Sequence, residues 1–521
     1  MAAPSSSAVA HPPLTGAQLV MGTIALSGAT FMNVLDTSIA NVSIPAISGD
    51  LGVSPTQGTW VITSFAVANA ISVPLTGWLA QRFGTVKLFM SSVLLFVLFS
   101  WLCGLAPSIE GLIFFRVMQG AVAGPMIPLS QTLLLSSYPR HKAGMALAMW
   151  SITTLVAPVV GPLLGGWITD NISWPWIFYI NVPVGLVAAG ATWSLYRHRD
   201  TPGRQLRMDK VGLALLVLWV GALQIALDKG KELDWFNSST IVGLFAVAAI
   251  GFAFFIAWEL TEQNPIVDLS LFKRRNYWAS TLTISLAYGV FFGNVVLLPL
   301  WLQQYQGYTA TAAGMALAPV GIFAILLSPF VGSRMGKADA RWFATIALAV
   351  FGIVLFMRSR FNTEADQITI MIPTLVQGVA MAFFFIPLIT IALHGLQPER
   401  IPAASSLNNF MRITAGAFGT SIFSTLWDDR AAMHHSRLTE HLSQADGTFQ
   451  QTMLGLQQSG LTPTQSAAML NRVVDQQAAM LSADDLFLAS SVLFIVLIGL
   501  VWLAGPVKGS GGDGGEAAGA H

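Results

Sequence analysis

Residues 17–40 read AQLVMGTIALSGATFMNVLDTSIA, and this stretch sets the class of fold. Asp36 is its single charged residue, and the others are apolar, small or neutral polar. Because a helix needs roughly 20 mostly apolar residues to cross a bilayer, the stretch predicts a membrane-spanning helix. A carboxylate at membrane depth is energetically costly, so such a residue usually faces a partner or a cavity and has a function.

The rest of the chain repeats this pattern of apolar blocks. Of the 521 residues, 54% are hydrophobic and 10% are charged, whereas a soluble domain carries roughly 25% charged residues. The blocks therefore predict an all-α membrane protein with fourteen transmembrane helices. The expected spans are 17–40, 58–80, 86–106, 111–135, 143–168, 175–195, 210–228, 239–259, 277–304, 312–333, 342–360, 367–393, 402–427 and 486–505.

Charge and cysteine content exclude several classes of function. The net charge of +1 gives no electrostatic support for a nucleic-acid partner. The single cysteine, Cys103, excludes a disulfide framework and a cysteine metal cluster, and the histidines show no metal-ligand spacing. We therefore expect no metal and no cofactor.

Fourteen spans place both termini on one side of the membrane. If that side is the cytoplasm, the inside connections hold 17 Lys and Arg residues and the outside connections hold 7. This is the bias that the positive-inside rule requires. Residues 1–16, rich in Ser, Ala and Pro, and the Gly-rich residues 506–521 are expected to be disordered cytoplasmic extensions.

Short sequence motifs recur along the chain, and each is separated from its repeat by nearly the same number of residues. Residues 118–120 (MQG) return 258 residues later as VQG, residues 127–129 (IPL) return after 259 residues, and the motif Pro74-x-x-Gly77 returns after 255 residues. Such repeats are typical of transporters built from two halves. The predicted division is a six-helix half at 17–196, two inserted transmembrane helices with flanking cytoplasmic loops at 197–275, and a six-helix half at 276–505.

The second half includes one long polar loop, 428–485, which this topology places outside the cytoplasm. Apolar residues such as Leu438 and Leu442 recur there at helical spacing. One interpretation is a helical cap that packs on the outer face. The other is a docking surface for a partner outside the membrane.

Two charged residues inside spans are the main functional candidates. Asp36 is a candidate for taking up and releasing protons, although an Asp near a helix end could also be a solvated cap. Arg116 occurs only in the first half, because the equivalent position of the repeat is Thr374. Asp36 is its natural partner, and the alternative is a structural Arg that binds backbone carbonyls.

Two glycine-containing motifs are candidates for conformational roles. Residues 77–87 (GWLAQRFGTVK) predict a tight cytoplasmic turn with basic anchors, formed by Gly77, Arg82, Gly84 and Lys87. Residues 157–166 (APVVGPLLGG) place small residues on one helix face and prolines within the helix. They suit a hinge between the halves, or a static kink; the residues concerned are Pro158, Gly161, Pro162, Gly165 and Gly166.

The remaining candidates concern a substrate cavity. Arg412 is a second intramembrane charge, which could line a cavity or pair with a lipid headgroup. Aromatic residues in spans could shape an apolar pocket, although such residues often serve only packing. The cavity candidates are Asn33, Asn41, Trp60, Gln119, Trp150, Phe291, Phe292 and Arg412.

Several of these words together resemble a known family. Residues 35–45 (LDTSIANVSIP), 77–87, 116–120 (RVMQG) and 161–166 resemble motifs of the fourteen-span drug:proton antiporters of the major facilitator superfamily. Residues 174–183 (WPWIFYINVP) and 264–269 (NPIVDL) are typical of the same EmrB/QacA-type subfamily, and the likeness covers nearly the whole chain. The sequence is most similar to EmrB-type inner-membrane pumps.

The resemblance implies export of small hydrophobic compounds across a bacterial inner membrane in exchange for protons. It implies Asp36 as the proton site, Arg116 as the coupling residue and 161–166 as the antiport hinge. It also implies a periplasmic adaptor of the EmrA type and an outer-membrane channel. The loop motif departs from the family at Gln81, usually acidic, and at Thr85, usually basic, which puts a cytoplasmic charge lock in doubt.

Other functions remain as alternatives. The cargo could be narrower, namely a fatty acid, a siderophore or a metabolite. A membrane-embedded enzyme is disfavoured because no catalytic constellation is found at membrane depth. A channel is disfavoured because no charge ring stands out.

Overall fold

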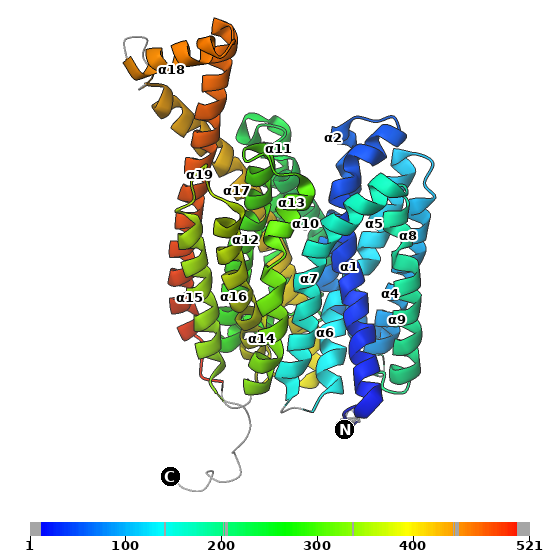
Figure 1. Ribbon diagram of the computed structural model, residues 1–521. Coiled ribbons are helices and arrows are strands. Elements are labelled where there is room, and N and C mark those ends of the chain that lie inside the picture. The colour runs from blue at the N-terminus through cyan, green and yellow to red at the C-terminus, as the bar shows by residue number, and fades with distance from the viewer. Residues whose placement is uncertain are drawn as a thin grey trace, which may run out of the picture.

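The computed structural model describes residues 12–139, 142–201, 203, 207–335, 338–440, 442 and 447–507. Within these residues the regular secondary structure is helical, and most helices run roughly parallel in one bundle (Figure 1). Most of the two predicted terminal extensions lies outside the described residues. In the described part of the first one, α1 already begins at Gly16.

The helices follow the order of the predicted spans. The N-terminal half comprises α1 (Gly16–Asp50), α2 (Pro55–Gly58), α3 (Trp60–Phe83), α4 (Thr85–Gly104), α5 (Ile109–Ala123), α6 (Met126–Ser137), α7 (Ala143–Asn171), α8 (Trp176–Tyr179) and α9 (Asn181–Tyr196). The inserted segment comprises α10 (Lys210–Lys229), η2 (Trp235–Asn237), α11 (Ser239–Thr261) and η3 (Leu269–Lys273). The C-terminal half comprises α12 (Arg275–Gln304), α13 (Ala310–Leu317), α14 (Val320–Arg334), α15 (Ala340–Arg358), α16 (Gln367–Leu393), η4 (Pro398–Arg400), α17 (Ile401–Glu440), α18 (Gly447–Gln458) and α19 (Pro463–Trp502).

Length and hydropathy support the predicted number of spans. Among the described residues, 12 helices are long and apolar enough to cross a membrane, and α7 raises the number to 13 as a pair bent by 42°. The remaining predicted span, in α17, is less apolar because Ser405, Asn408 and Arg412 lie within it. These polar residues are buried in the bundle. We therefore count α17, the thirteenth span in chain order, as the helix that brings the total to fourteen.

The polar segment 428–485 differs from the loop that the sequence predicts. Helix α17 continues to Glu440 and α19 already begins at Pro463, so two spans extend beyond their expected ends. Together with α18 they form a projection that stands away from the bundle (Figure 1). We call residues 428–485 the helical extension. Amphipathic helices need not end where the apolar part of a span ends, so both helices continue into the segment in which apolar residues recur at helical spacing.

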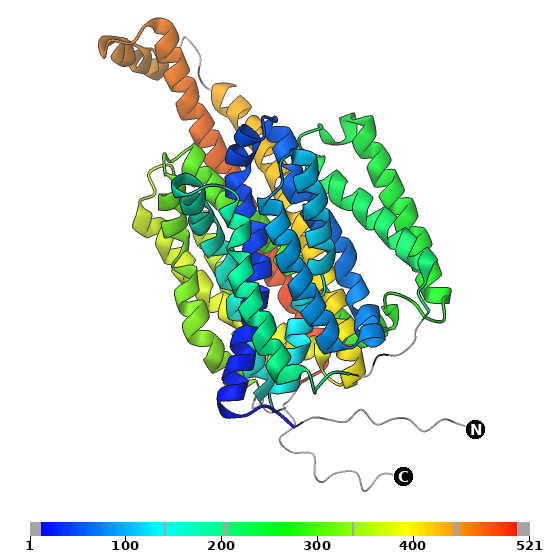
Figure 2. The same ribbon diagram turned by 90° about the vertical axis from the view of Figure 1, so that its right-hand side faces the viewer.

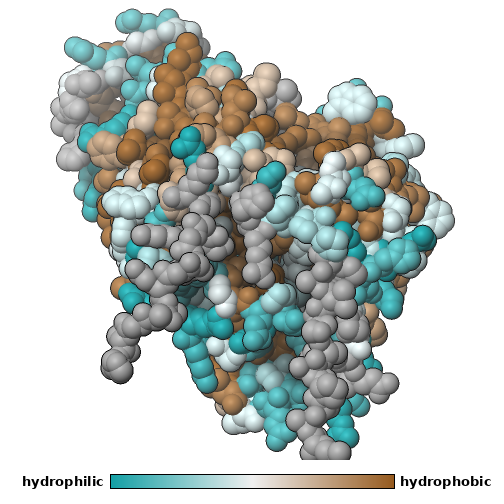
Figure 3. Space-filling model, turned by 90° about the horizontal axis from the view of Figure 1, so that it is seen from below, coloured by the Kyte–Doolittle hydropathy of each residue, from teal (hydrophilic) through white to brown (hydrophobic). Residues whose placement is uncertain are grey.

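The two ends of the bundle are distinct. Helix α1 begins and α19 ends at one end, the terminal face, and the helical extension lies at the other, the extension face (Figure 1). Hydrophilic side chains gather on the terminal face beside apolar ones (Figure 3). Because both chain ends meet one face, the described helices cross the bundle an even number of times.

The two halves meet closely at the terminal face. A Cβ placed on Gly144 of α7 would lie 2.4 Å from the carbonyl oxygen of Gly332 in α14. A Cβ on Gly77 of α3 would lie 2.8 Å from the Cα of Ala403 in α17. Glycine is required at both places because only hydrogen fits between the backbones. Two backbone contacts therefore close the terminal face, and each joins a helix of the N-terminal half to a helix of the C-terminal half.

The inserted helices form a hairpin at one edge of the bundle (Figure 2). Helix α10 contacts the N-terminal half, where Lys229 donates to the hydroxyl of Thr59 at 2.6 Å. It also contacts the C-terminal half, where the ring of Trp219 packs edge-on against Phe410 with centroids 5.8 Å apart. The hairpin therefore adjoins both halves at the α3–α17 side of their interface.

Candidate proton-coupling site and family

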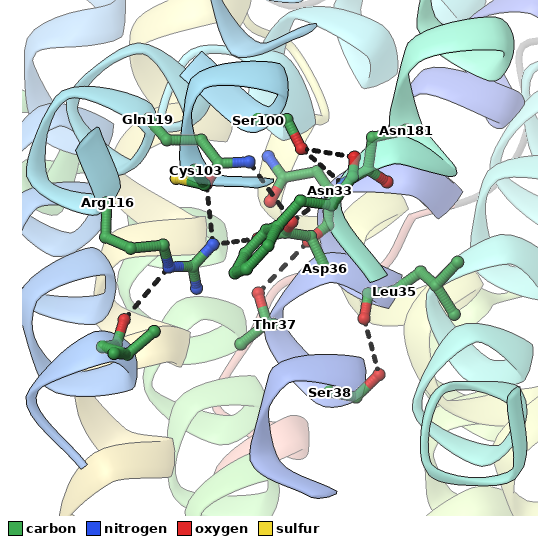
Figure 4. Close-up of polar contacts among 12 residues, drawn as sticks. Asn33, Leu35, Asp36, Thr37, Ser38, Ser100, Cys103, Arg116, Gln119 and Asn181 are labelled. Carbon is green, nitrogen blue, oxygen red and sulfur yellow. Dashed lines mark hydrogen bonds and ion pairs between the residues drawn. The ribbon is translucent and has the colours of Figure 1, made fainter. Parts of the chain in front are cut away.

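Asp36 lies in the interior of the N-terminal half, where neither it nor Arg116 has exposed side-chain surface. One guanidinium nitrogen of Arg116 is 2.6 Å from Oδ2 of Asp36. Oδ1 accepts hydrogen bonds from Asn181 at 2.8 Å and from Gln119 at 3.2 Å (Figure 4). A buried carboxylate needs such compensation, because burial of an unpaired charge is very costly.

Arg116 is held by several partners at once. Its Nε donates to the backbone carbonyl of Val61 at 3.0 Å, and its Nη1 also reaches Oε1 of Gln119 at 2.7 Å. The guanidinium lies 4.2 Å from the ring centre of Phe65, a cation–π contact. Arg116 therefore pairs with Asp36 and also binds a backbone carbonyl, and its coupling role stays a prediction.

Helices from across the N-terminal half build this site. Asp36 comes from α1, Val61 from α3, Arg116 and Gln119 from α5, and Asn181 from the first turn of α9. Asn181 also donates to Ser100 of α4 at 3.0 Å. A proton added to Asp36 would remove the negative charge and leave the buried Arg116 uncompensated. The site can therefore couple a protonation event to the packing of five helices.

The small-residue motif of α7 packs next to this site. A Cβ on Gly161 would lie 1.9 Å from Oγ of Ser38, and one on Gly165 would lie 2.9 Å from the carbonyl oxygen of Ile39. Both partners belong to α1, so this face of α7 packs inside the N-terminal half, whereas α7 meets the other half through Gly144 and Leu163. Between the halves, a Cβ on Gly314 of α13 would meet Leu163 at 3.0 Å. The role of Pro158, Gly161, Pro162, Gly165 and Gly166 as a hinge stays a prediction.

The loop motif at residues 77–87 is held by an acidic residue that the sequence analysis did not single out. Gly84 has φ of 92°, a conformation that favours glycine. The carboxylate of Asp200, which follows α9, accepts a hydrogen bond from the backbone N–H of Val86 at 2.9 Å and lies 3.9 Å from Lys87. Asp200 thus binds a free N–H in the first turn of α4. Arg82 stacks over the Trp78 ring at 5.5 Å.

The predicted cavity residues separate into groups. Gln119 belongs to the Asp36 site, and Asn33 donates to the carbonyl of Ala123 at 3.0 Å within the same half. Asn41 is exposed on α1, and Trp60 lies beneath Lys229 near the extension face, with 5.4 Å between Nζ and the ring centre. The structure brings the others together around the interface of the halves; they are Trp150, Phe291, Phe292 and Arg412.

The repeat offset of 258 residues relates Gln119 to Gln377. For Asp36 the two offsets of 258 and 255 residues give Asn294 and Phe291, neither of which carries a charge. In the C-terminal half, Asn294 of α12 donates to Ser490 of α19 at 3.1 Å, much as Asp36 binds Asn181 of α9. Gln377 accepts a hydrogen bond from Arg358 of α15 at 2.6 Å. The second half thus holds two separate polar contacts, Asn294 with Ser490 and Arg358 with Gln377, and no carboxylate takes part in either. Arg358 is one of the 7 Lys and Arg residues counted with the outside connections, near the end of the expected span 342–360, and the structure buries it.

Comparison with known proteins identifies the class. A profile of the Major Facilitator Superfamily matches residues 26–420. The fold resembles the crystal structure of the human organic anion transporter MFSD10 (TETRAN), with a TM-score of 0.56, 12% identity, and coverage of 94% of this chain and 100% of that one. The chain belongs to the Major Facilitator Superfamily and is a membrane transporter, not an enzyme.

Within this superfamily the chain is similar to EmrB-type pumps over nearly its full length. It is 53% identical over 506 residues to the multidrug export protein EmrB of Escherichia coli (strain K12), covering 97% of this chain and 99% of that one. It is 49% identical over 504 residues to the fatty acid resistance protein FarB of Neisseria gonorrhoeae, with the same coverage. The resemblance inferred from the motifs is confirmed.

Proposed function

We propose that this chain is a proton-coupled antiporter that exports small hydrophobic compounds across a bacterial inner membrane, with both termini cytoplasmic. The observation that supports it most strongly is the fully buried ion pair of Asp36 and Arg116. A membrane protein retains such a pair at high cost, which argues for a role in the transport cycle. The similarity to proteins named for multidrug export agrees with this cargo class.

In this proposal the two halves alternate access by rocking about their interface. Protonation of Asp36 from outside releases Arg116 from its partner and changes the packing of α1 against α5 and α9. Gly161 and Gly165 place α7 directly on α1, so a shift of α1 reaches the helix that contacts α14 at the terminal face. Substrate binding from the cytoplasm or the inner leaflet favours the deprotonated state.

The first experiment measures substrate-induced proton release in proteoliposomes. We expect release from the intact chain and less than about a tenth of it from Asp36→Asn, because an amide cannot exchange the proton. The Asn294→Ala variant, at a related position of the other half, is the control and should retain release. Undiminished proton release from Asp36→Asn would refute the assignment of the proton site.

A narrower cargo is the second candidate. The fatty acid resistance protein of Neisseria gonorrhoeae is nearly as similar to this chain as the multidrug export proteins are. Proton release that follows addition of fatty acids, and not of structurally unrelated apolar drugs, would favour it.

We further propose that the helical extension docks a periplasmic adaptor, which would join the pump to an outer-membrane channel. The extension projects from the bundle, and apolar residues on it are exposed, among them Leu454, Met469 and Val473. Met469 and Val473 are four residues apart on α19 and share one face.

Replacing Leu454, Met469 and Val473 together with serine should lower co-purification with the adaptor about tenfold or more, as expected when apolar anchors leave an interface. Proton release in proteoliposomes should stay unchanged, because these residues lie outside the bundle. Undiminished co-purification of the triple variant would count against the docking surface.

A further inference from the structure

We propose that Arg412 is the binding residue for the acidic group of an amphipathic organic anion, a molecule with one carboxylate or phenolate and an aromatic or aliphatic body. This inference rests on the proposed export function and names a residue that would give the substrate site its preference for acidic compounds. It is carried by the surroundings of Arg412, which differ from those of the other buried arginines.

Arg412 is 4% exposed and lies in α17. Its hydrogen-bond partner is Oδ1 of Asn409, at 2.7 Å. Nε is buried with no hydrogen-bond acceptor among the described residues, and no carboxylate of the described chain pairs with this guanidinium. An arginine side chain carries five N–H donors and stays charged at any physiological pH. Donors and charge are therefore left for a group that the chain itself does not supply.

Aromatic rings surround the guanidinium. Its central carbon lies 4.8 Å from the ring centre of Tyr288, 5.3 Å from that of Phe385 and 5.9 Å from that of Trp150. Tyr288 stacks in turn on Phe292, with ring centres 4.5 Å apart. The faces of aromatic rings attract a cation, but ring carbons do not accept ordinary hydrogen bonds from its N–H groups. They also offer apolar surface to the body of a bound molecule.

The position of Arg412 fits a substrate site better than a structural one. Trp150 comes from α7 of the N-terminal half, whereas Tyr288, Phe385 and Arg412 come from the C-terminal half. The cluster therefore spans the interface that must open and close during alternating access. Arg412 lies nine residues beyond Ala403, about 14 Å along α17 from the closed terminal face.

The other two buried arginines in the bundle lack this combination. Arg116 is neutralised by Asp36 at 2.6 Å. Arg358 also has no carboxylate partner among the described residues, and its Nε is likewise without an acceptor. It differs from Arg412 in its surroundings, because its guanidinium contacts Thr374 and Gln377, both from its own half. Arg412 alone among these three joins an unpaired charge to an aromatic surface between the halves. A carboxylate is the natural ligand, because the guanidinium fork matches its two oxygens.

The test compares two molecules of equal shape, 2-naphthoate and the neutral 2-naphthamide, bound to the purified full-length protein and followed by isothermal titration calorimetry. The intact chain should bind the naphthoate about tenfold more tightly than the amide, as expected for a charge-assisted hydrogen bond. Arg412→Gln should abolish this preference and leave naphthamide affinity within about twofold. Arg412→Lys should retain part of the preference, because the charge remains without the fork.

Arg358→Gln is the matched control, since it also removes a buried arginine but away from the interface, and it should leave the preference intact. Equal weakening of both ligands by Arg412→Gln, or an unchanged ratio, would overturn the inference. An intact chain that binds the amide without preferring the naphthoate would overturn this inference and leave the proposed export function standing. An intact chain that binds neither molecule would count against both.

Discussion

Replacement of Arg116 with glutamine should lower the free energy of unfolding by about 3–5 kcal/mol, the usual cost of removing one partner from a buried ion pair. Asp36 would keep its hydrogen bonds from Asn181 and Gln119 but would lose the compensating positive charge. Thermal unfolding of the purified protein, followed by tryptophan fluorescence, measures the change as a lower melting temperature.

The second replacement Asp36→Asn should restore most of the stability lost in Arg116→Gln. An amide carries no charge, so a site with both changes contains no unpaired ion. Transport should stay abolished in the double variant, because no group at this site can exchange a proton. If the double variant is no more stable than Arg116→Gln alone, the two residues are not energetically coupled, and the interpretation of the site fails.

Substitution of Gly144 by alanine should lower transport about tenfold. Its Cβ would lie 2.4 Å from a backbone oxygen of Gly332, which cannot move aside as a flexible side chain would. Overpacking of this kind costs about 1–3 kcal/mol, and here the cost falls only on states in which the terminal face is closed. The population should therefore shift toward states with this face open. Initial rates of substrate export from proteoliposomes measure the effect.

Gly332→Ala should reproduce the loss, because its Cβ would lie 2.6 Å from the Gly144 oxygen. Gly190→Ala in α9 is the control, since a Cβ there meets nothing within 4 Å. This control should transport normally and be slightly more stable, as alanine favours helix over glycine. Normal transport by both Gly144→Ala and Gly332→Ala would show that this closed contact is not an obligatory state.

How well the sequence predicts the residues of this site depends on how rare each residue type is within membrane spans. Charges are scarce in apolar spans, so Asp36 and Arg116 could be recognised as partners from composition alone. Asn181 and Ser100 complete the same site, but neutral polar residues are common in spans and carry no comparable signal. Their role depends on how α4 and α9 pack on α1, which is a tertiary property.

Boundaries and motifs show the same limit. Hydropathy predicted fourteen spans but gives no helix ends, because α17 and α19 continue as amphipathic helices beyond the apolar part of their spans. Spacing correctly put Gly161 and Gly165 on one helix face. It could not say which helix would meet that face, and the structure places α1 there. Arg358 was counted with the outside connections because charge near a span end normally faces water.

The lack of a carboxylate at the related position of the C-terminal half has a consequence for the number of protons exchanged in each transport cycle. The two repeat offsets relate Asp36 to Asn294 and to Phe291, and neither side chain can take up a proton. With Asp36 as the proton site, this pair of related positions carries one proton in each cycle rather than two. One proton crossing 100 mV supplies about 2.3 kcal/mol, which corresponds to roughly fifty-fold accumulation of a neutral substrate. Because the related position carries no second carboxylate, the membrane potential acting through these two positions would support no larger substrate gradient than this.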